Sequence, residues 1–91
     1  MWYQVLDQGN REGNYLEATG SSMFTYSLLK AVRKGYISTD YKTVALKAYS
    51  GILGTLIKNN SDGTISLTKC CSVAGLGGNP YRDGSYEYYI K

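Results

Sequence analysis

Apolar residues follow two different patterns in the two stretches of the chain that have helical periodicity. From about Leu16 the sequence reads LEATGSSMFTYSLLKAVRKGY. At about 100° per residue its apolar side chains fall nearly all round a helix, and no charge stands between Ala18 and Leu29. The stretch Lys42–Lys58 carries a single apolar stripe opposite polar residues. These patterns predict an antiparallel helical hairpin in which one helix is buried on all sides and the other covers it.

Capping signals predict the ends of both helices. Asn14 is the candidate N-cap of the first helix, and Glu17 three residues later completes a capping box. Gly35 follows two cations and ends this helix, because glycine readily adopts the left-handed conformation found after a helix C-terminus. Asp40 is expected to cap the second helix, and the turn-rich NNSDG ends it.

The remaining segments are short. Trp2 to Leu6, WYQVL, predicts a strand or an extended segment, and the alternation from Thr64 to Thr68 predicts a short strand. SYEYYIK at the C-terminal end is either the opening turn of a helix capped by Ser85 or an extended segment, and the turn is favoured. The predicted fold class is therefore all-α with short extended segments.

Chain length limits what these elements can bury. Ninety-one residues fit one small domain, whose folding removes only about 60–70% of the unfolded surface from water. So short a chain has too few partners to surround an apolar helix, which makes it part of a larger unit and predicts self-association with a second copy. The residues expected in that contact are Met23, Phe24, Leu28 and Leu29, with the small residues Gly20 and Ser21 allowing close approach.

Charge and residue types exclude several functions. The net charge of +3 is spread without a long basic run, which is typical of a solvated surface rather than a nucleic-acid site. No apolar stretch reaches the roughly 20 residues of a membrane span, and the start lacks a signal-peptide pattern, so we expect a cytoplasmic protein. Histidine is absent, and adjacent Cys70 and Cys71 favour two buried thiols, so no metal or cofactor is expected.

The stretch AGLGGNPYRDG, residues 74–84, concentrates four glycines and the only proline. It lacks both the G-x-G-x-x-G spacing of a dinucleotide site and the G-K-[ST] ending of a P-loop. Pro80 has no N–H to donate, and Asp83 would repel an anion. A phosphate cradle is therefore disfavoured, and the loop has to be judged by its aromatic and charged residues.

Three separated motifs carry a resemblance to a known family. WYQVLDQG, GNYLEATGSSMFTYSLLKAVRKGY and VAGLGGNPYRDGSYEYYI resemble, in this order, the C-terminal part of the unsaturated rhamnogalacturonyl hydrolases, glycoside hydrolase family 105. Their relatives are the unsaturated glucuronyl hydrolases of family 88. The resemblance covers almost the whole chain and is weakest around YKTVALKAYSGILG. It implies an (α/α)6 barrel in which the predicted hairpin is one inner and one outer helix.

The resemblance also implies an activity: removal of a 4,5-unsaturated uronic acid from the non-reducing end of lyase-derived oligosaccharides, without a metal. An aspartate protonates C4, water adds at C5, and the resulting hemiketal opens. In the family this aspartate lies in an upstream motif, M-W-L-D-G-L-Y-M, and a second motif, R-G-N-G-W, holds the uronate. Neither motif occurs in this chain. Residues 1–91 are therefore expected to be a single partial domain that is inactive alone.

The carboxylates give no catalytic pair. Conventional glycosidases need two carboxylates, and here each one falls in a turn, a cap or a polar loop, where backbone hydrogen bonding explains it. Glu17, at the start of an apolar helix, is the most interesting of them, yet the capping box accounts for it. No catalytic residue is assigned. The seven carboxylates are Asp7, Glu12, Glu17, Asp40, Asp62, Asp83 and Glu87.

Four residues are candidates for binding the oligosaccharide. Trp2 and Tyr3 offer aromatic faces to a sugar ring, and Tyr81 with Arg82 offers an aromatic face and a bidentate partner for a carboxylate. A tryptophan at the start of a segment is more often a core anchor, Arg82 is also explained as the partner of Asp83 or Glu87, and the ten tyrosines are also explained as half-buried packing. The alternative function is a free-standing carbohydrate- or protein-binding helical module.

Overall fold

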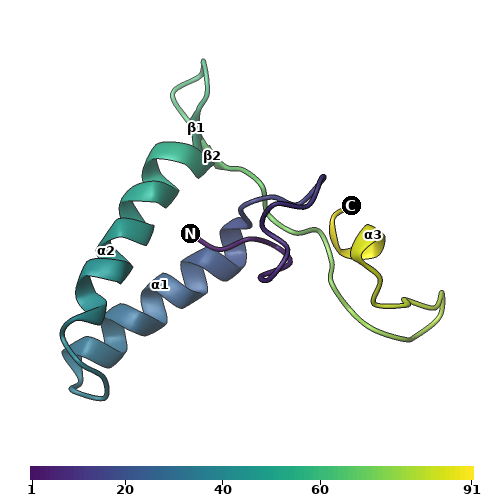
Figure 1. Ribbon diagram of the computed structural model, residues 1–91. Helices are drawn as coiled ribbons and strands as arrows, with labels where there is room; N and C mark the ends of the chain where they lie inside the picture. Colours follow the sequence, from purple (N-terminus) through teal and green to yellow (C-terminus); the bar gives the residue numbers. More distant parts are fainter.

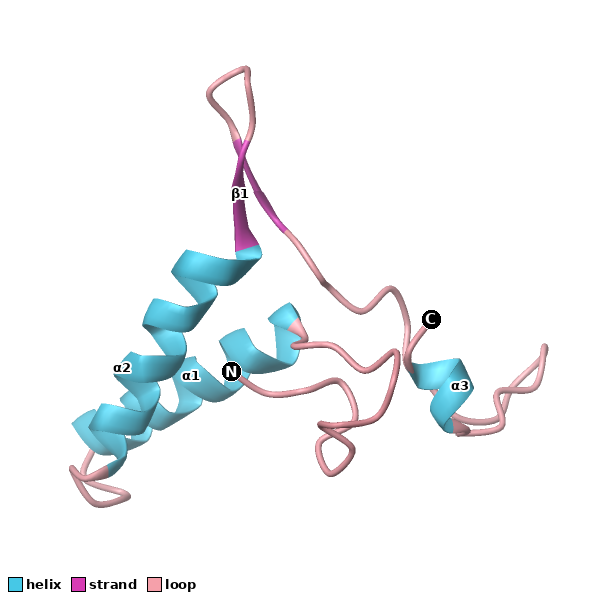
Figure 2. Ribbon diagram, turned by 45° about the horizontal axis from the view of Figure 1, so that its top comes forward, coloured by secondary structure: helices cyan, strands magenta, loops and turns pink.

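The computed structural model describes residues 1–91, and helices make up most of its regular structure (Figure 1). A two-stranded antiparallel sheet adds to the predicted helical fold (Figure 2). The elements are α1 (Ala18–Arg33), α2 (Tyr41–Gly51), the π-helical turn η1 (Ile52–Leu56), β1 (Ile57–Asn59), β2 (Ile65–Leu67) and α3 (Tyr86–Tyr89). None of these helices combines the length and the apolar character needed to cross a bilayer.

The helices α1 and α2 form the predicted hairpin. Their axes diverge from the connecting loop (Figures 1 and 2). Even so, Ile52 and Leu56 of η1 form one buried cluster with Ala18 at the start of α1. The stop at the end of α1 is confirmed: Lys34 is the C-cap and Gly35 follows with a φ of +75°. The side chains of this cluster, together with Met1, therefore fill the space where the two helices diverge.

The predicted start of α1 is wrong by three residues. Glu17, not Asn14, is the N-cap, and its carboxylate accepts hydrogen bonds from the N–H groups of Thr19 and Gly20. The Asn14 amide instead holds the preceding loop, because it donates to the carbonyl oxygens of Val5 and Gln8. The Asn14 Oδ1, the acceptor that a cap would need, is used by the N–H groups of Val5 and Tyr15.

The predicted second helix is too long at its C-terminal end, and its predicted cap is wrong. Asp40 stands at the N-cap position, but its side chain makes no capping hydrogen bond. The helical conformation ends at Leu56 rather than Lys58, because residues 57–59 pair with residues 65–67 in an antiparallel hairpin. The predicted strand at Thr64–Thr68 is confirmed in its central three residues, whereas its partner strand was not predicted.

Within this chain α1 is not buried on all sides, which agrees with the expectation that 91 residues supply too few partners to surround it. Only Ala18, Ser21 and Thr25 of α1 are buried, whereas Met23 is 63% and Phe24 43% exposed. The reason is that α2 and the N-terminal segment cover one side of the helix and nothing in the chain covers the other. Ser21 is buried by the N-terminal segment, so Gly20 and Ser21 do not offer a surface for close approach of a second copy. The small apolar core is formed by Ala18, Ile52 and Leu56.

The N-terminus lies between α1 and α2, where Met1 packs against the core, whereas the C-terminus lies outside the hairpin beside α3 (Figure 1). The predicted strand or extended segment from Trp2 to Leu6 is wrong beyond Tyr3, which forms a single bridge with Leu16. Residues 4 and 5 bend the chain, and a turn begins at Leu6. The predicted turn at the C-terminal end is confirmed as α3, where the Ser85 hydroxyl accepts from the Tyr88 N–H. The N-terminal segment therefore lies between α1 and α3.

Candidate functional site

A hollow of about 140 Å³ lies where the N-terminal segment crosses the first turns of α1. It combines aromatic walls with one carboxylate and several small or polar groups. We refer to it as the N-terminal hollow. Its lining residues are Trp2, Tyr3, Gln4, Leu6, Glu17, Gly20, Ser21 and Phe24.

Backbone hydrogen bonds fix the aromatic wall of the hollow. The Trp2 N–H donates to the Ser21 hydroxyl at 2.9 Å, and the Trp2 carbonyl accepts from the Glu17 N–H at 3.0 Å. The Trp2 ring meets Phe24 edge to face, with centroids 5.2 Å apart. Tyr3 lines the same hollow and is 39% exposed. Two of the four candidate binding residues are thus brought together, while their sugar-binding role stays a prediction.

Glu17 is the one carboxylate of the hollow, and only 5% of its surface is exposed. It accepts from the Thr19 hydroxyl at 2.7 Å, and from the N–H groups of Gly20 at 2.6 Å and Cys71 at 2.8 Å. Burial alone would raise the pKa of Glu17, but the hydrogen bonds outweigh it and hold that pKa below its ordinary value of 4.5. The Glu17 carboxylate is therefore ionised near neutral pH. It joins the start of α1 to Cys71 through hydrogen bonds and does not act as a proton donor.

The two cysteines do not match the predicted pair of buried thiols. Cys70 is exposed, and only Cys71 is partly buried. The Cys71 sulfur accepts from the Gln4 amide at 3.2 Å, and that amide also donates to the Tyr89 carbonyl at 3.0 Å. Burial and then the neighbouring Cys71 raise the pKa of Tyr15. The Gln4 amide therefore links the hollow to Cys71 and to Tyr89 in the C-terminal region.

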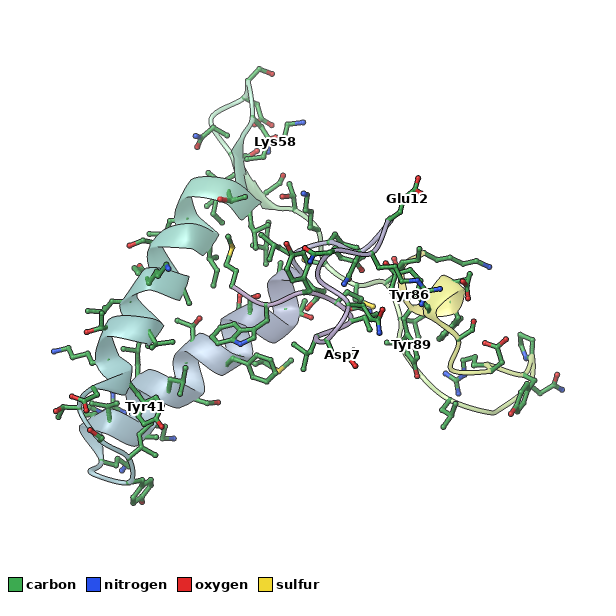
Figure 3. All side chains as sticks on the ribbon, in the orientation of Figure 1. Asp7, Glu12, Tyr41, Lys58, Tyr86 and Tyr89 are labelled. Atoms are coloured by element: carbon green, nitrogen blue, oxygen red, sulfur yellow. The ribbon has the colours of Figure 1, made fainter.

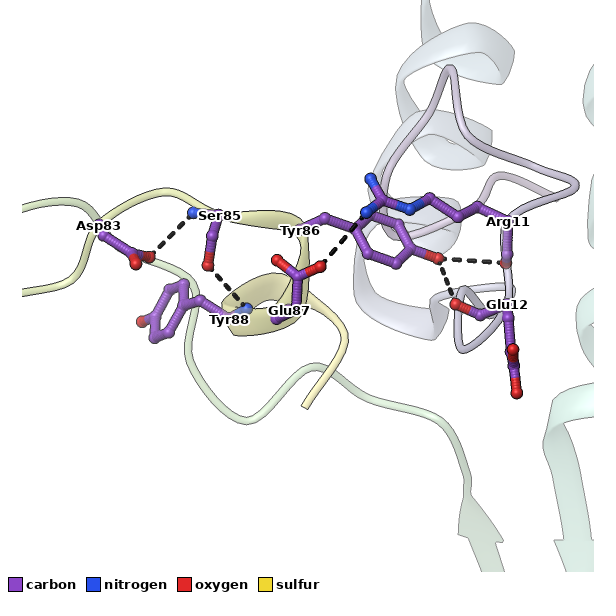
Figure 4. Close-up of polar contacts among 7 residues, drawn as sticks. All are labelled: Arg11, Glu12, Asp83, Ser85, Tyr86, Glu87 and Tyr88. Atoms are coloured by element: carbon purple, nitrogen blue, oxygen red, sulfur yellow. Dashed lines mark hydrogen bonds and ion pairs between the residues drawn. The ribbon is translucent and has the colours of Figure 1, made fainter.

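A cation and a tyrosine hold α3 against the loop that precedes α1 (Figure 4). The Arg11 guanidinium lies 3.8 Å from the ring centroid of Tyr86 and 3.2 Å from a carboxylate oxygen of Glu87. The Tyr86 hydroxyl donates to the carbonyl oxygens of Arg11 and Glu12. Arg11 was not among the predicted site residues, because its partners Tyr86 and Glu87 lie 75 and 76 residues further along the chain. For Tyr86 the packing explanation of the abundant tyrosines is confirmed.

Tyr81 and Arg82 lie in the glycine loop, residues 74–84. This loop projects beyond α3, away from α1 (Figures 1 and 2), so these two candidates are not brought to the hollow. Tyr81 is 76% exposed. Arg82 pairs with neither Asp83 nor Glu87, since its Nε donates to the carbonyl of Gly77 at 2.8 Å.

The other carboxylates have mainly structural surroundings. Asp62 accepts from the hydroxyl and the N–H of Thr64, and Asp83 from the N–H of Ser85, and these hydrogen bonds lower the pKa of both groups. Asp7 and Glu12 lie on the N-terminal loop (Figure 3). No group of three or more His, Cys, Asp or Glu residues has an arrangement that could hold a metal ion.

The family described as Glycosyl Hydrolase Family 88 matches residues 1–91. Protein Atu3128 of Agrobacterium fabrum and the 24.9 kDa protein in picA locus of Rhizobium radiobacter are each 40% identical over 96 residues, which cover 99% of this chain and 41% of theirs. A solved glycoside hydrolase from family 105 of C. acetobutylicum ATCC 824 is 57% identical, with a TM-score of 0.92, and the match covers 98% of this chain and 25% of that one.

These similarities define the class as glycoside hydrolase. The chain belongs to the group formed by glycoside hydrolase families 88 and 105. This confirms the resemblance seen in the three sequence motifs. It spans less than half the length of the curated relatives and a quarter of the solved structure.

Proposed function

We propose that this chain is the C-terminal part of an (α/α)6-barrel glycoside hydrolase that acts on oligosaccharides left by rhamnogalacturonan or related lyases. The enzyme removes a 4,5-unsaturated uronic acid from the non-reducing end by hydrating its double bond. The N-terminal hollow contributes one wall of the sugar site through Trp2 and Tyr3, and the 91-residue chain alone is inactive. Two free cysteines agree with a cytoplasmic location, where thiols stay reduced.

The chemistry of the N-terminal hollow carries this proposal. Aromatic side chains bind the apolar faces of sugar rings, and Trp2, Tyr3 and Phe24 supply three of them at one place. Protonation of an enol ether requires an acid that holds a proton near neutral pH, whereas the only carboxylate there, Glu17, is kept ionised by its hydrogen bonds. The hollow thus offers aromatic groups that can bind a sugar but no group that can protonate the double bond. This supports the proposal that the chain alone is inactive.

The open shape of the chain supports a larger helical domain. Its accessible surface is 6585 Å², against about 5,200 Å² for a compact monomer of 10.0 kDa. Its radius of gyration is 15.5 Å, against about 12 Å for 91 residues. The excess area, on the order of 1,300 Å², exceeds the roughly 800 Å² that one partner buries in a standard interface. Further helices of a barrel would cover α1 and α2.

Tryptophan fluorescence tests the substrate class directly, because Trp2 is the only tryptophan in the chain. We expect a saturable change in Trp2 emission with unsaturated galacturonyl-rhamnose and none with a neutral disaccharide. Tyr3→Ala should weaken the response, and Tyr36→Ala, a substitution at a 77% exposed position far along the hairpin, should not. An equal response to the neutral disaccharide would contradict the proposed substrate class.

Turnover is followed in the same mixtures by the loss of ultraviolet absorbance of the unsaturated bond. The chain alone should leave the absorbance unchanged. Turnover by the chain alone would contradict the statement that its acid lies elsewhere. Saturable binding of neutral sugars without turnover would favour the binding-module alternative.

Without other helices to cover it, the chain should pair with a second copy through the open side of α1. Met23 and Phe24 are exposed there and Leu28 is half-buried, whereas the half-buried Leu29 lies on the side of α2. Sedimentation at micromolar concentration should give a mass above that of the monomer. Met23→Ser with Phe24→Ser should restore a monomer, and Tyr36→Ser should not. A compact wild-type monomer would contradict self-association.

A further inference from the structure

The glycine loop is a closed turn rather than a loose connection. The backbone groups of Gly77 and Arg82 exchange two hydrogen bonds, at 2.7 and 3.1 Å. The hydroxyl groups of two α3 tyrosines hold its base, because Gly75 donates its N–H to Tyr88 and accepts from Tyr89 through its carbonyl. Its shape is therefore set by contacts within about fifteen residues of sequence.

The Arg82 guanidinium fills the inside of this turn. Its Nε donates to the Gly77 carbonyl at 2.8 Å. A Cβ added at Gly78 would lie 2.9 Å from one terminal nitrogen, and a Cβ at Gly75 would collide with the other. The backbone of Gly75 has no positive φ, so conformation does not require glycine there. Glycine at position 75 is explained by the room that the guanidinium needs.

The terminal nitrogens of Arg82 have no protein partner. Arg11 and Glu87 form the only ion pair of the chain, and the Asp83 carboxylate is turned to the N–H of Ser85 (Figure 4). Every fully buried side-chain nitrogen or oxygen has a hydrogen-bond partner, so the unpaired terminal nitrogens of this half-buried Arg82 are not fully buried. A planar guanidinium fixed at Nε presents two parallel N–H groups, which is the arrangement that a carboxylate accepts in bidentate fashion.

We propose that the glycine loop is a second carbohydrate site, in which Arg82 binds the carboxylate of a uronic acid unit outside the N-terminal hollow. The choice of an acidic sugar rests on the proposed function. The loop geometry supports it independently, since the fixed guanidinium lacks a carboxylate partner within the chain. The neighbouring Asp83 favours a singly charged carboxylate over a phosphate dianion.

Galacturonic acid is the probe, with galactose as its neutral counterpart and inorganic phosphate as a second anion. Amide spectra of the isotopically labelled chain should show saturable shifts at Gly75, Gly77 and Gly78 and at the Arg82 Nε–H. Galactose should produce none of these shifts, and phosphate should bind more weakly. Equal shifts with galactose, or tighter binding of phosphate, would overturn the proposal.

Three variants separate the guanidinium from charge in general. Arg82→Gln should weaken binding at least tenfold, as expected for loss of about 1.4 kcal/mol or more from a charged hydrogen-bond pair. Gly75→Ala keeps every charge but displaces the guanidinium, and should weaken binding comparably. Lys47→Gln removes a charge from an exposed position of α2 and should bind as wild type.

The amide spectra also show whether each variant keeps the fold, through the unchanged signals of α1 and α2. Undiminished binding by a folded Arg82→Gln chain would refute the site. Trp2 fluorescence reports on the hollow and the glycine amides on the loop, so failure of the proposed function and failure of this second site give different results.

Discussion

The N-terminal hollow and the glycine loop are built in opposite ways. The hollow joins residues far apart in sequence: Glu17 accepts from Cys71, 54 residues on, and Ser21 from Trp2, 19 residues back. The glycine loop is closed by Gly77 and Arg82, five residues apart. The shape of the hollow therefore depends on the whole fold, whereas the loop keeps its shape through local contacts. Substitutions in the first should act globally and those in the second locally.

The largest effect is expected for Glu17→Gln. The amide keeps one acceptor oxygen but places an NH₂ group against N–H donors that now lack a partner. We expect the free energy of unfolding to fall by roughly 2–3 kcal/mol, as for a buried hydrogen bond to a charged group. Denaturant unfolding measures the change, and Glu12→Gln, at an exposed position, is the matched control. Equal free energies of unfolding for the two variants would show that the hydrogen bonds of Glu17 do not stabilise the fold.

Low pH should weaken the hydrogen bonds that the Glu17 carboxylate accepts, because it protonates that group. The pKa of Glu17 in the folded state lies below its ordinary value of 4.5. Ionised Glu17 therefore contributes stability above about pH 4.5, and this contribution is lost as the pH falls through the lowered folded-state value. Denaturant unfolding between neutral pH and pH 3 should show a steeper loss for wild type than for Glu17→Gln. Parallel pH profiles would contradict this assignment.

Paired glycine substitutions test whether the glycine loop is local. Gly77→Ala meets no atom within 4 Å, so its cost is the strain of a φ of +70°, on the order of 1 kcal/mol. Gly75→Ala instead meets the Arg82 guanidinium. Both should speed hydrogen exchange within residues 74–84 and leave α1 unchanged. Faster exchange in α1 would mean that the loop is coupled to the hollow.

The smallest effect is expected where α3 meets the N-terminal loop. The Arg11 and Glu87 side chains are 48% and 72% exposed, so their ion pair is screened by water. Glu87→Gln should cost about 0.2–1 kcal/mol in denaturant unfolding at low salt, and the cost should shrink in high salt. A salt-independent loss above that range would indicate that α3 is part of the global fold.

Local patterns in the sequence predicted much of the fold. Helical periodicity gave the hairpin, Gly35 ended α1, Ser85 capped α3, and alternation located the strand around Ile65–Leu67. Each of these signals depends on neighbours within one or two turns. The order of three motifs was enough to recognise the family. Trp2 and Tyr3 line one hollow, and their role in binding a sugar stays a prediction.

Tertiary structure alone decided the rest. Glu17 became the cap in place of Asn14 because the Asn14 Oδ1 accepts instead from the N–H groups of Val5 and Tyr15. The second helix ended at Leu56 because residues 57–59 pair with residues 65–67 in a hairpin, and this pairing of backbone groups has no counterpart in the helical periodicity. Sequence could not show which face of α1 lies open, since burial depends on which segments return to the helix and from where. Contacts across 19 to 75 residues are set by the path of the whole chain, and no local pattern encodes them.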